Sequence, residues 1–121
     1  MRETKIPGVF LAERGRSIGS SLVGYFTASY SQLELLLGPP NTESDGYKVS
    51  TEWVLQLEDG TAFTVYDYKE TDMYESGLPS VAEFRKFSSY EWHIGGPNRG
   101  NMEKPAWFYR VTSLLNAGLG L

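Results

Sequence analysis

Alternation between apolar and polar positions is clearest over residues 48–57, where five side chains share one face of a predicted strand. A turn at residues 58–61 follows, in which Gly60 is free to take a positive φ. Residues 62–68 then form a second run that is rich in aromatic and β-branched residues. The pattern predicts a β-hairpin, and because two strands are not stable alone, it predicts an antiparallel sheet of at least four strands.

Shorter runs predict the remaining strands, at residues 9–11, 22–28 and 90–94. The last of these is expected to end at Gly95, because the sequence Gly95-Gly-Pro-Asn-Arg-Gly100 can turn sharply. Residues 14–21, between the first two strands, contain small residues and two arginines. They are interpreted as a flexible hairpin loop, and the alternative is a glycine-rich arm that contacts a phosphate or a partner chain.

A short helix is predicted directly after residue 28. Ser29 and Gln32 have the spacing of a capping box, in which each residue bonds a free amide of the other. Leucines at positions 33, 36 and 37 follow and form one apolar stripe. Gly38 and the two prolines after it end the helix.

Two further helices are predicted in the second half of the chain. Ser80 is expected to cap a short helix that carries Val81, Phe84 and Phe87. A C-terminal helix is expected from about Pro105 to Asn116. Its buried stripe is expected to consist of Trp107, Val111, Leu114 and Leu115.

These elements together predict an α+β fold. We expect an antiparallel β-sheet of four to six strands, with one short helix after the N-terminal strands and a C-terminal helix. The chain has 121 residues and no segment with the composition of a linker. Residues 1–121 are therefore expected to form a single domain.

Composition excludes several kinds of site. The chain has no cysteine and a single histidine, which excludes a disulfide scaffold and a cysteine nucleophile and argues against a histidine-based metal site. No cofactor is expected. The net charge of −4 argues against direct DNA binding and against an anionic membrane surface. A cytosolic protein is expected, because no apolar run has the length of a signal peptide or a membrane span.

The charges are unevenly distributed along the chain. Nine acidic residues lie between Glu43 and Glu75, whereas five basic residues lie between Arg85 and Arg110. The basic third surrounds the glycine-rich turn at residues 95–100. Consecutive amides and an arginine in such a turn favour anion binding, and the alternative is an ordinary surface loop with solvated charges.

Aromatic residues recur on two of the predicted strands. Tyr66 and Tyr68 share one face of their strand, and Tyr90 and Trp92 share one face of theirs. If these strands are neighbours, the rings form a cluster. Such a cluster belongs either to a core or dimer interface, or to a surface that stacks on a base or a nicotinamide-like ring.

His93 points to the opposite side of its strand from Trp92. A lone histidine in a strand is more often a hydrogen-bonded structural residue than a base. Acting as a base would require an orienting carboxylate nearby, such as Asp67. No nucleophile or acid pair can be assembled from the spacing of the residues, so an enzyme is not expected.

A resemblance to a known family rests on three segments: residues 47–61, Val65-Tyr-Asp-Tyr-Lys69 and Glu91-Trp-His-Ile-Gly-Gly96. With the leucine helix and its Gly38-Pro39-Pro40 end before them, their order resembles the first-described family of phage Thoeris anti-defence (anti-Thoeris) proteins. The similarity covers about residues 22–98. Members of that family act as sponges: they sequester a cyclic ADP-ribose signal, made by the host's TIR-domain immune enzyme, without cleaving it.

The resemblance implies an antiparallel sheet with a C-terminal helix, a dimer or higher homo-oligomer, and a ligand pocket between subunits. It also implies ligand contacts within Trp92, His93, Gly95 and Gly96, on Asn98 and Arg99, and on Arg110. In our leading hypothesis Arg99 and Arg110 pair with phosphate, and Asn98, Gly95 and Gly96 make close polar contacts. Trp92, Tyr66 or Tyr68 stack on a ring or support the pocket wall.

The leading hypothesis is therefore a phage-encoded immune-evasion protein of the host cytoplasm. It would bind a cyclic ADP-ribose-type or cyclic oligonucleotide signal by sequestration, with no catalytic residue. The alternative is a protein–protein inhibitor of a host defence complex, similar to an anti-CRISPR acidic mimic, whose acidic residues 43–75 cover a basic host surface. A nucleotide-cleaving enzyme that uses His93 and Asp67 is a third hypothesis.

Overall fold

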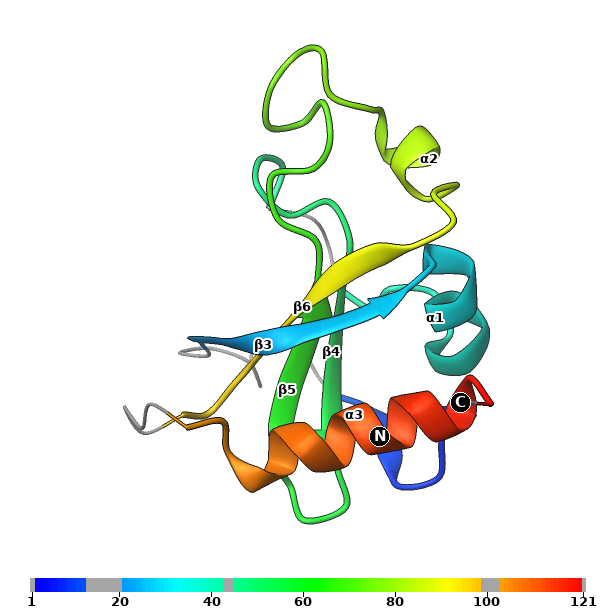
Figure 1. Ribbon diagram of the computed structural model, residues 1–121, viewed down its shortest axis with the longest axis vertical. Helices are drawn as coiled ribbons and strands as arrows, with labels where there is room; N and C mark the ends of the chain where they lie inside the picture. Colours follow the sequence, from blue (N-terminus) through cyan, green and yellow to red (C-terminus); the bar gives the residue numbers. More distant parts are fainter. Residues whose placement is uncertain (1, 13–20, 43–44, 99–102, 121) are drawn as a thin grey trace.

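Six antiparallel strands form one sheet in the order β1-β2-β4-β5-β6-β3 in the computed structural model, which describes residues 2–12, 21–42, 45–98 and 103–120 (Figure 1). The strands are β1 (Arg2–Glu3), β2 (Val9–Leu11), β3 (Ser21–Ala28), β4 (Glu52–Leu57), β5 (Ala62–Tyr66) and β6 (Tyr90–Gly96). The helices are α1 (Tyr30–Leu37), α2 (Val81–Phe84) and α3 (Ala106–Gly118). The predicted α+β fold, with a short helix after the N-terminal strands and a C-terminal helix, is confirmed.

The core lies between one face of the sheet and the helices α1 and α3 (Figure 1). Alternate side chains of the central strands point into it, and Trp53, Trp92 and Ile94 are fully buried there. The leucine stripe of α1 belongs to the same cluster. The opposite face of the sheet points away from α1 and α3, and we call it the outer face.

The predicted capping box at Ser29 is present, and the predicted cap at Ser80 is confirmed. The hydroxyl of Ser29 accepts a bond from the amide of Gln32 at 3.0 Å, and the Gln32 side chain accepts one from the amide of Ser29 at 2.9 Å. Ser80 and Glu83 form the corresponding pair at the start of α2. Gly38 ends α1 with a positive φ of 83°, as its position after the leucine stripe predicts.

The central hairpin is confirmed, with shorter strands than the alternation predicts. Strand β4 begins at Glu52 and β5 ends at Tyr66, rather than at residues 48 and 68. The buried carboxylate of Asp67 accepts bonds from the amides of Ser50 and Thr51, each at 2.8 Å. A side chain thus occupies the amides that would otherwise extend the ladder.

Two boundaries in the second half were predicted wrongly. Strand β6 does not end at Gly95 but continues through Gly96, because Gly95 pairs with Thr64 of β5 and both glycines pair with β3. Helix α2 ends at Phe84, and Phe87 lies beyond it with 42% of its surface exposed. The spacing of three between Phe84 and Phe87 therefore does not reflect one continuous helix.

The buried stripe of α3 is also displaced from the predicted one. Val111 and Leu115 are buried as expected, but the third buried residue is Phe108, whereas Trp107 and Leu114 are only partly buried against the core. Room for Phe108 comes from a glycine on β3: a Cβ atom at Gly24 would lie 2.5 Å from Cζ of Phe108. That close approach sets the rotation of the helix.

Most of the predicted arm at residues 14–21 lies outside the described residues, since the structure describes only its last residue, Ser21, at the start of β3. Within the described part of the chain, no helix is long and apolar enough to cross a membrane.

Candidate functional site

Four ring side chains gather on the outer face of the sheet: Tyr25, Tyr66, Tyr68 and His93. Tyr25 on β3 and Tyr66 on β5 are both cross-strand partners of His93 on β6, so the three rings lie in one row across neighbouring strands. The ring centroids of Tyr25 and Tyr66 lie 5.0 Å and 5.3 Å from that of His93. Tyr68, just after β5, lies 5.8 Å away. We call these four residues the outer-face cluster.

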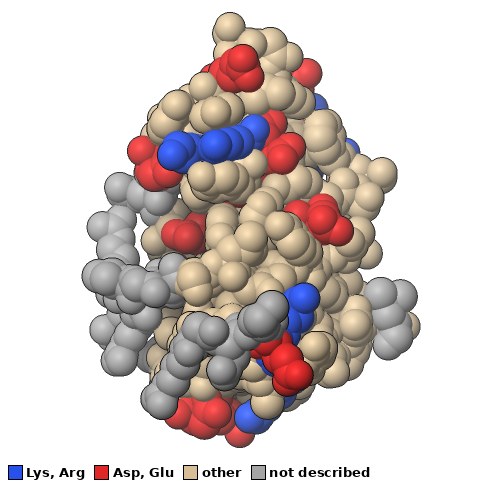
Figure 2. Space-filling model, turned by 60° about the vertical axis from the view of Figure 1, so that its left-hand side comes forward, with Lys and Arg blue, Asp and Glu red and all other residues tan. Residues whose placement is uncertain are grey.

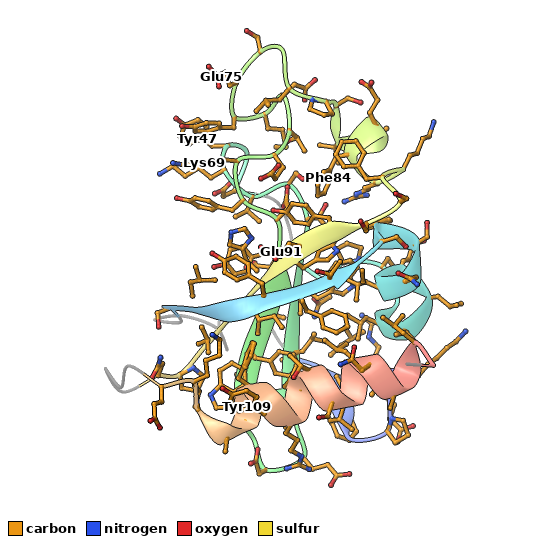
Figure 3. The ribbon with its side chains drawn as sticks, in the orientation of Figure 1. Tyr47, Lys69, Glu75, Phe84, Glu91 and Tyr109 are labelled. Atoms are coloured by element: carbon orange, nitrogen blue, oxygen red, sulfur yellow. The ribbon has the colours of Figure 1, made fainter. Side chains whose placement is uncertain are left out.

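A lysine extends the outer-face cluster toward a second pair of rings. The amine of Lys69 lies 5.1 Å from the ring centroid of Tyr68 and 5.2 Å from that of Tyr74. Tyr74 in turn contacts Tyr47, at 5.2 Å between centroids. Tyr47 and Lys69 lie together on one side of the molecule in Figure 3. Their arrangement puts a cation within a row of aromatic surfaces.

The backbone of Lys69 is unusual for a residue with a side chain. Its φ is 61°, in the left-handed region, and its amide donates to the carbonyl of Lys48 at 2.7 Å. This conformation costs a non-glycine residue about 1 kcal/mol or more. The turn places Lys69 between Tyr68 and Tyr74.

Carboxylates surround these rings. Burial raises the pKa of Glu52, and the negative charges of Asp45 and Asp67 raise it further. Burial also raises the pKa of Glu70, and the negative charge of Asp67 raises it further. Figure 2 turns the side of the molecule that carries Tyr47 and Lys69 toward the viewer, and it shows basic side chains in a row with acidic ones at both ends. The surface is therefore aromatic with mixed charge.

His93 is held mainly by rings. Burial, the largest cause, lowers the pKa of His93 below its usual value, and the charges of Asp67 and Glu91 oppose this shift. Its Nδ1 atom lies 3.5 Å from the hydroxyl of Tyr90, at the limit of a hydrogen bond. The environment favours the neutral imidazole, whose ring packs well against tyrosines.

Asp67 has structural partners. Besides the two amides, its carboxylate accepts a bond of 2.6 Å from the hydroxyl of Ser50. Burial raises the pKa of Asp67 above its usual value, and the bonds from Ser50 and Thr51 lower it less. The hydrogen bonds described for this carboxylate go to Ser50 and Thr51, and none of them reaches His93.

The structure brings together three of the residues predicted from the sequence, namely Tyr66, Tyr68 and His93. Trp92 lies on the other face of β6, is fully buried, and donates from its indole nitrogen to the carbonyl of Ala28 at 2.9 Å. Trp92 thus packs in the core and is not exposed at the outer face. Its alternation with His93 follows from the strand itself.

The remaining predicted residues lie elsewhere. Gly95 and Gly96 are buried inside β6, where Trp107 packs against Gly96. Arg110 is exposed on α3 and lies near Asp59. The pKa of Asp59 is lowered mainly by hydrogen bonds from Thr61, and the positive charge of Arg110 lowers it further. Asn98 is partly exposed just beyond β6, and Arg99 lies outside the described residues.

Sequence reasoning missed Tyr25, Tyr47, Lys69 and Tyr74. The alternation of residues 22–28 places Tyr25 opposite Phe26, which is a signal that could have found it. No periodic pattern marks Tyr47, Lys69 and Tyr74, because these residues lie in irregular segments that only the fold brings together.

A groove of about 740 Å³ lies away from these rings, between the N-terminal residues and α1. It is lined by the first strand, by Lys5 and by the exposed side chain of Leu35. In the described part of the chain, no group of three or more histidine, aspartate or glutamate side chains is placed to hold a metal ion.

Comparison with known proteins adds no family. No model of a known protein family matches the chain, and a search of curated proteins gives no significant match.

Proposed function

We propose that the protein binds a cyclic ADP-ribose-type or cyclic oligonucleotide signal and sequesters it without cleavage, as a phage-encoded protein in the host cytoplasm. The observation that supports this proposal best is the outer-face cluster with Lys69 beside it. A nucleotide presents a flat base and a phosphate. Tyrosine rings stack on bases at about 1–3 kcal/mol each, and an ammonium group pairs with phosphate.

The role proposed for each residue in ligand binding depends on how far its side chain is exposed. Tyr25 and Tyr68 expose 46% and 37% of their surface and would stack on the base. Lys69 would pair with a phosphate. Tyr66 and His93 are partly buried beneath them and would fix the positions of the stacking rings.

A homo-oligomer is part of the proposal. Arg110 lies beside Asp59 in the turn between β4 and β5, whereas Tyr66 lies at the other end of that hairpin. Arg110 would therefore reach the ligand only from a second copy of the chain. Asn98 and Arg99 follow the last residue of β6 and remain candidates for polar contacts in the same pocket.

The test is ligand capture. The protein is incubated with cyclic ADP-ribose isomers and separated from free ligand, then heated, and the released ligand is identified. Unaltered ligand in stoichiometric amount is expected. No retained ligand would contradict the proposal, and chemically altered ligand would show that the protein is an enzyme.

Two variants locate the site. Tyr68→Ala removes one stacking ring and is expected to weaken binding about 5- to 150-fold, which corresponds to 1–3 kcal/mol. Tyr109→Ala is its matched control, since Tyr109 is 58% exposed on α3. Lys69→Gly removes the amine from a left-handed position that glycine accepts, and Lys86→Ala, at an exposed lysine away from the outer-face cluster, controls for the lost charge.

A second candidate function is inhibition of a host protein by charge mimicry. The carboxylates of Asp45 and Glu52 support it, because Asp45 is exposed and the pKa of partly exposed Glu52 is raised by burial and by the negative charge of Asp45. Such an acidic surface favours a basic partner. This candidate predicts protein binding that weakens steeply with salt and survives Arg99→Ala, whereas sequestration predicts that Arg99→Ala weakens capture of the nucleotide.

A further inference from the structure

The two edges of the sheet are built differently. The edge formed by β1 has two residues, Arg2 and Glu3, which are both charged and exposed. The edge formed by β3 has eight residues, and its sequence Ser-Leu-Val-Gly-Tyr-Phe-Thr-Ala contains no charge and no proline. Natural edge strands usually avoid pairing through short length, charge or proline. Only the β1 edge is protected in this way.

Strand β3 has one paired side. It pairs with β6 along its whole length, and among the described strands none pairs with its other side. Helix α3 packs on its inner face, where Phe108 lies against Gly24. The register shifts between Leu22 and Gly24, so the regular part of the strand is residues 24–28. An irregularity of this kind disturbs pairing at the start of the strand and leaves the regular part available.

The net charge of the chain and the exposure of side chains on β3 indicate which partner pairs with this strand. The chain carries a net charge of −4, so two copies repel each other except where their surfaces lack acids. Strand β3 is such a place, and its side chains Leu22 and Tyr25 are 45% and 46% exposed. An edge strand can pair antiparallel with the same strand of a second copy about a two-fold axis, and this pairing makes a closed and self-complementary contact.

We propose that β3 pairs antiparallel with β3 of a second copy, so that the two six-stranded sheets become continuous. The axis is perpendicular to the sheet, and both outer faces therefore point to the same side. Neighbouring strands lie about 4.8 Å apart, so Tyr25 of each copy approaches the junction and the two outer-face clusters form one aromatic surface. The pairing specifies an interface for the homo-oligomer of the proposed function and in that respect rests on it, but it needs no ligand, so dimerisation and ligand capture are measured separately.

The interface is small, because it consists of one strand edge and a few side chains. Small interfaces are typical of weak association, and we expect a dissociation constant of about 1–100 μM. The mass measured by light scattering or sedimentation should rise with concentration from one chain of 13.6 kDa toward twice that value. A wild-type protein that stays monomeric up to about 1 mM, well above that range, would overturn the proposal.

A double variant tests the location. Leu22→Lys with Thr27→Lys puts two cations on exposed positions of β3, and in antiparallel self-pairing both copies bring these like charges to the same junction. Thr27 is the cross-strand partner of Glu91, so a lysine there also gains an opposite charge within its own fold. The control is Leu35→Lys with Tyr109→Lys, which adds the same charge to exposed helix positions.

The β3 variant is expected to remain monomeric at concentrations where the wild type and the control dimerise. Hydrogen exchange provides a readout that does not depend on any variant. Amides of residues 21–28 should become more protected as wild-type concentration rises, with the rest of the chain unchanged. A β3 variant that dimerises as well as the wild type, or protection that appears on another element, would refute the interface.

Discussion

The indole ring of Trp107 lies directly on the backbone of Gly96, where a Cβ atom would come within 2.5 Å of Cη2 of that ring. The indole nitrogen donates to the carbonyl of Pro97 at 2.8 Å, and the ring stacks on Phe63 at 6.0 Å between centroids. The first turn of α3 is thereby docked onto the end of β6. A glycine in the predicted anion-binding turn has a packing role in the fold.

Gly96→Ala should destabilise the protein by about 1–3 kcal/mol, because the added methyl group must displace a rigid ring. Urea unfolding followed by tryptophan fluorescence measures the change. The same substitution in a Trp107→Ala background should cost less, since the ring is gone. Equal costs in both backgrounds would show that the glycine matters for another reason.

The side-chain amide of Asn41 forms hydrogen bonds with backbone groups of β4 and of the residue after β2, as a neighbouring strand would. Its side-chain nitrogen donates to the carbonyls of Ala12 and Val54, at 3.1 Å and 2.9 Å, and its oxygen accepts from the amide of Val54 at 2.8 Å. Asn41→Ala should cost about 2–3 kcal/mol, since backbone groups lose their partners. Asn41→Asp keeps the shape but turns the donor into an acceptor that faces two carbonyls. It should be at least as destabilising as Asn41→Ala, and an aspartate better tolerated than alanine would contradict the assignment.

Asp67 should tolerate the loss of its charge but not the loss of its oxygens. Burial raises the pKa of this carboxyl, which means that the fold disfavours the charged form. Asp67→Asn keeps an acceptor for the amides of Ser50 and Thr51 and should change stability by less than about 1 kcal/mol. Asp67→Ala leaves those amides without that acceptor and should cost at least about 2 kcal/mol. Similar losses for both variants would show that the charge itself is required.

Acid should weaken the fold through His93. The pKa of His93 is lowered in the folded state, so between that pKa and the unfolded value of about 6.5 the unfolded chain binds more protons. Stability is therefore fully present above about pH 6.5 and falls as the pH drops through the folded pKa. The groups that face the imidazole are Tyr25, Tyr66, Tyr68 and Tyr90, with Asp67 and Glu91 as the nearby charges.

Unfolding free energies at pH 7.5 and pH 5.0 check this prediction. His93→Phe keeps a ring in the cluster and removes the titrating group, so its loss of stability between the two pH values should be smaller than that of the wild type. Titrations of the carboxylates are common to both proteins and cancel in the comparison. A variant that loses as much stability as the wild type would exclude His93 as the cause.

Much of the fold could be predicted from local signals. The capping boxes at Ser29 and Ser80 each depend on residues three positions apart, and the hairpin depends on alternation within one segment. Predictions failed where a distant residue decides the outcome. Strand β6 continues through its glycines because β3 and β5 both pair with them, and α3 presents Phe108 because Gly24 leaves space for the ring.

The candidate site divides in the same way. Alternation alone puts Trp92 and His93 on opposite faces, so the sequence by itself determined which of the two could reach the outer face. Only the tertiary structure decided that Tyr25 and Tyr66 flank His93, that Lys69 lies over Tyr68, and that Arg110 is elsewhere. Strand periodicity is a property of consecutive residues, whereas strand order and register come from burying one shared core, which no local pattern encodes.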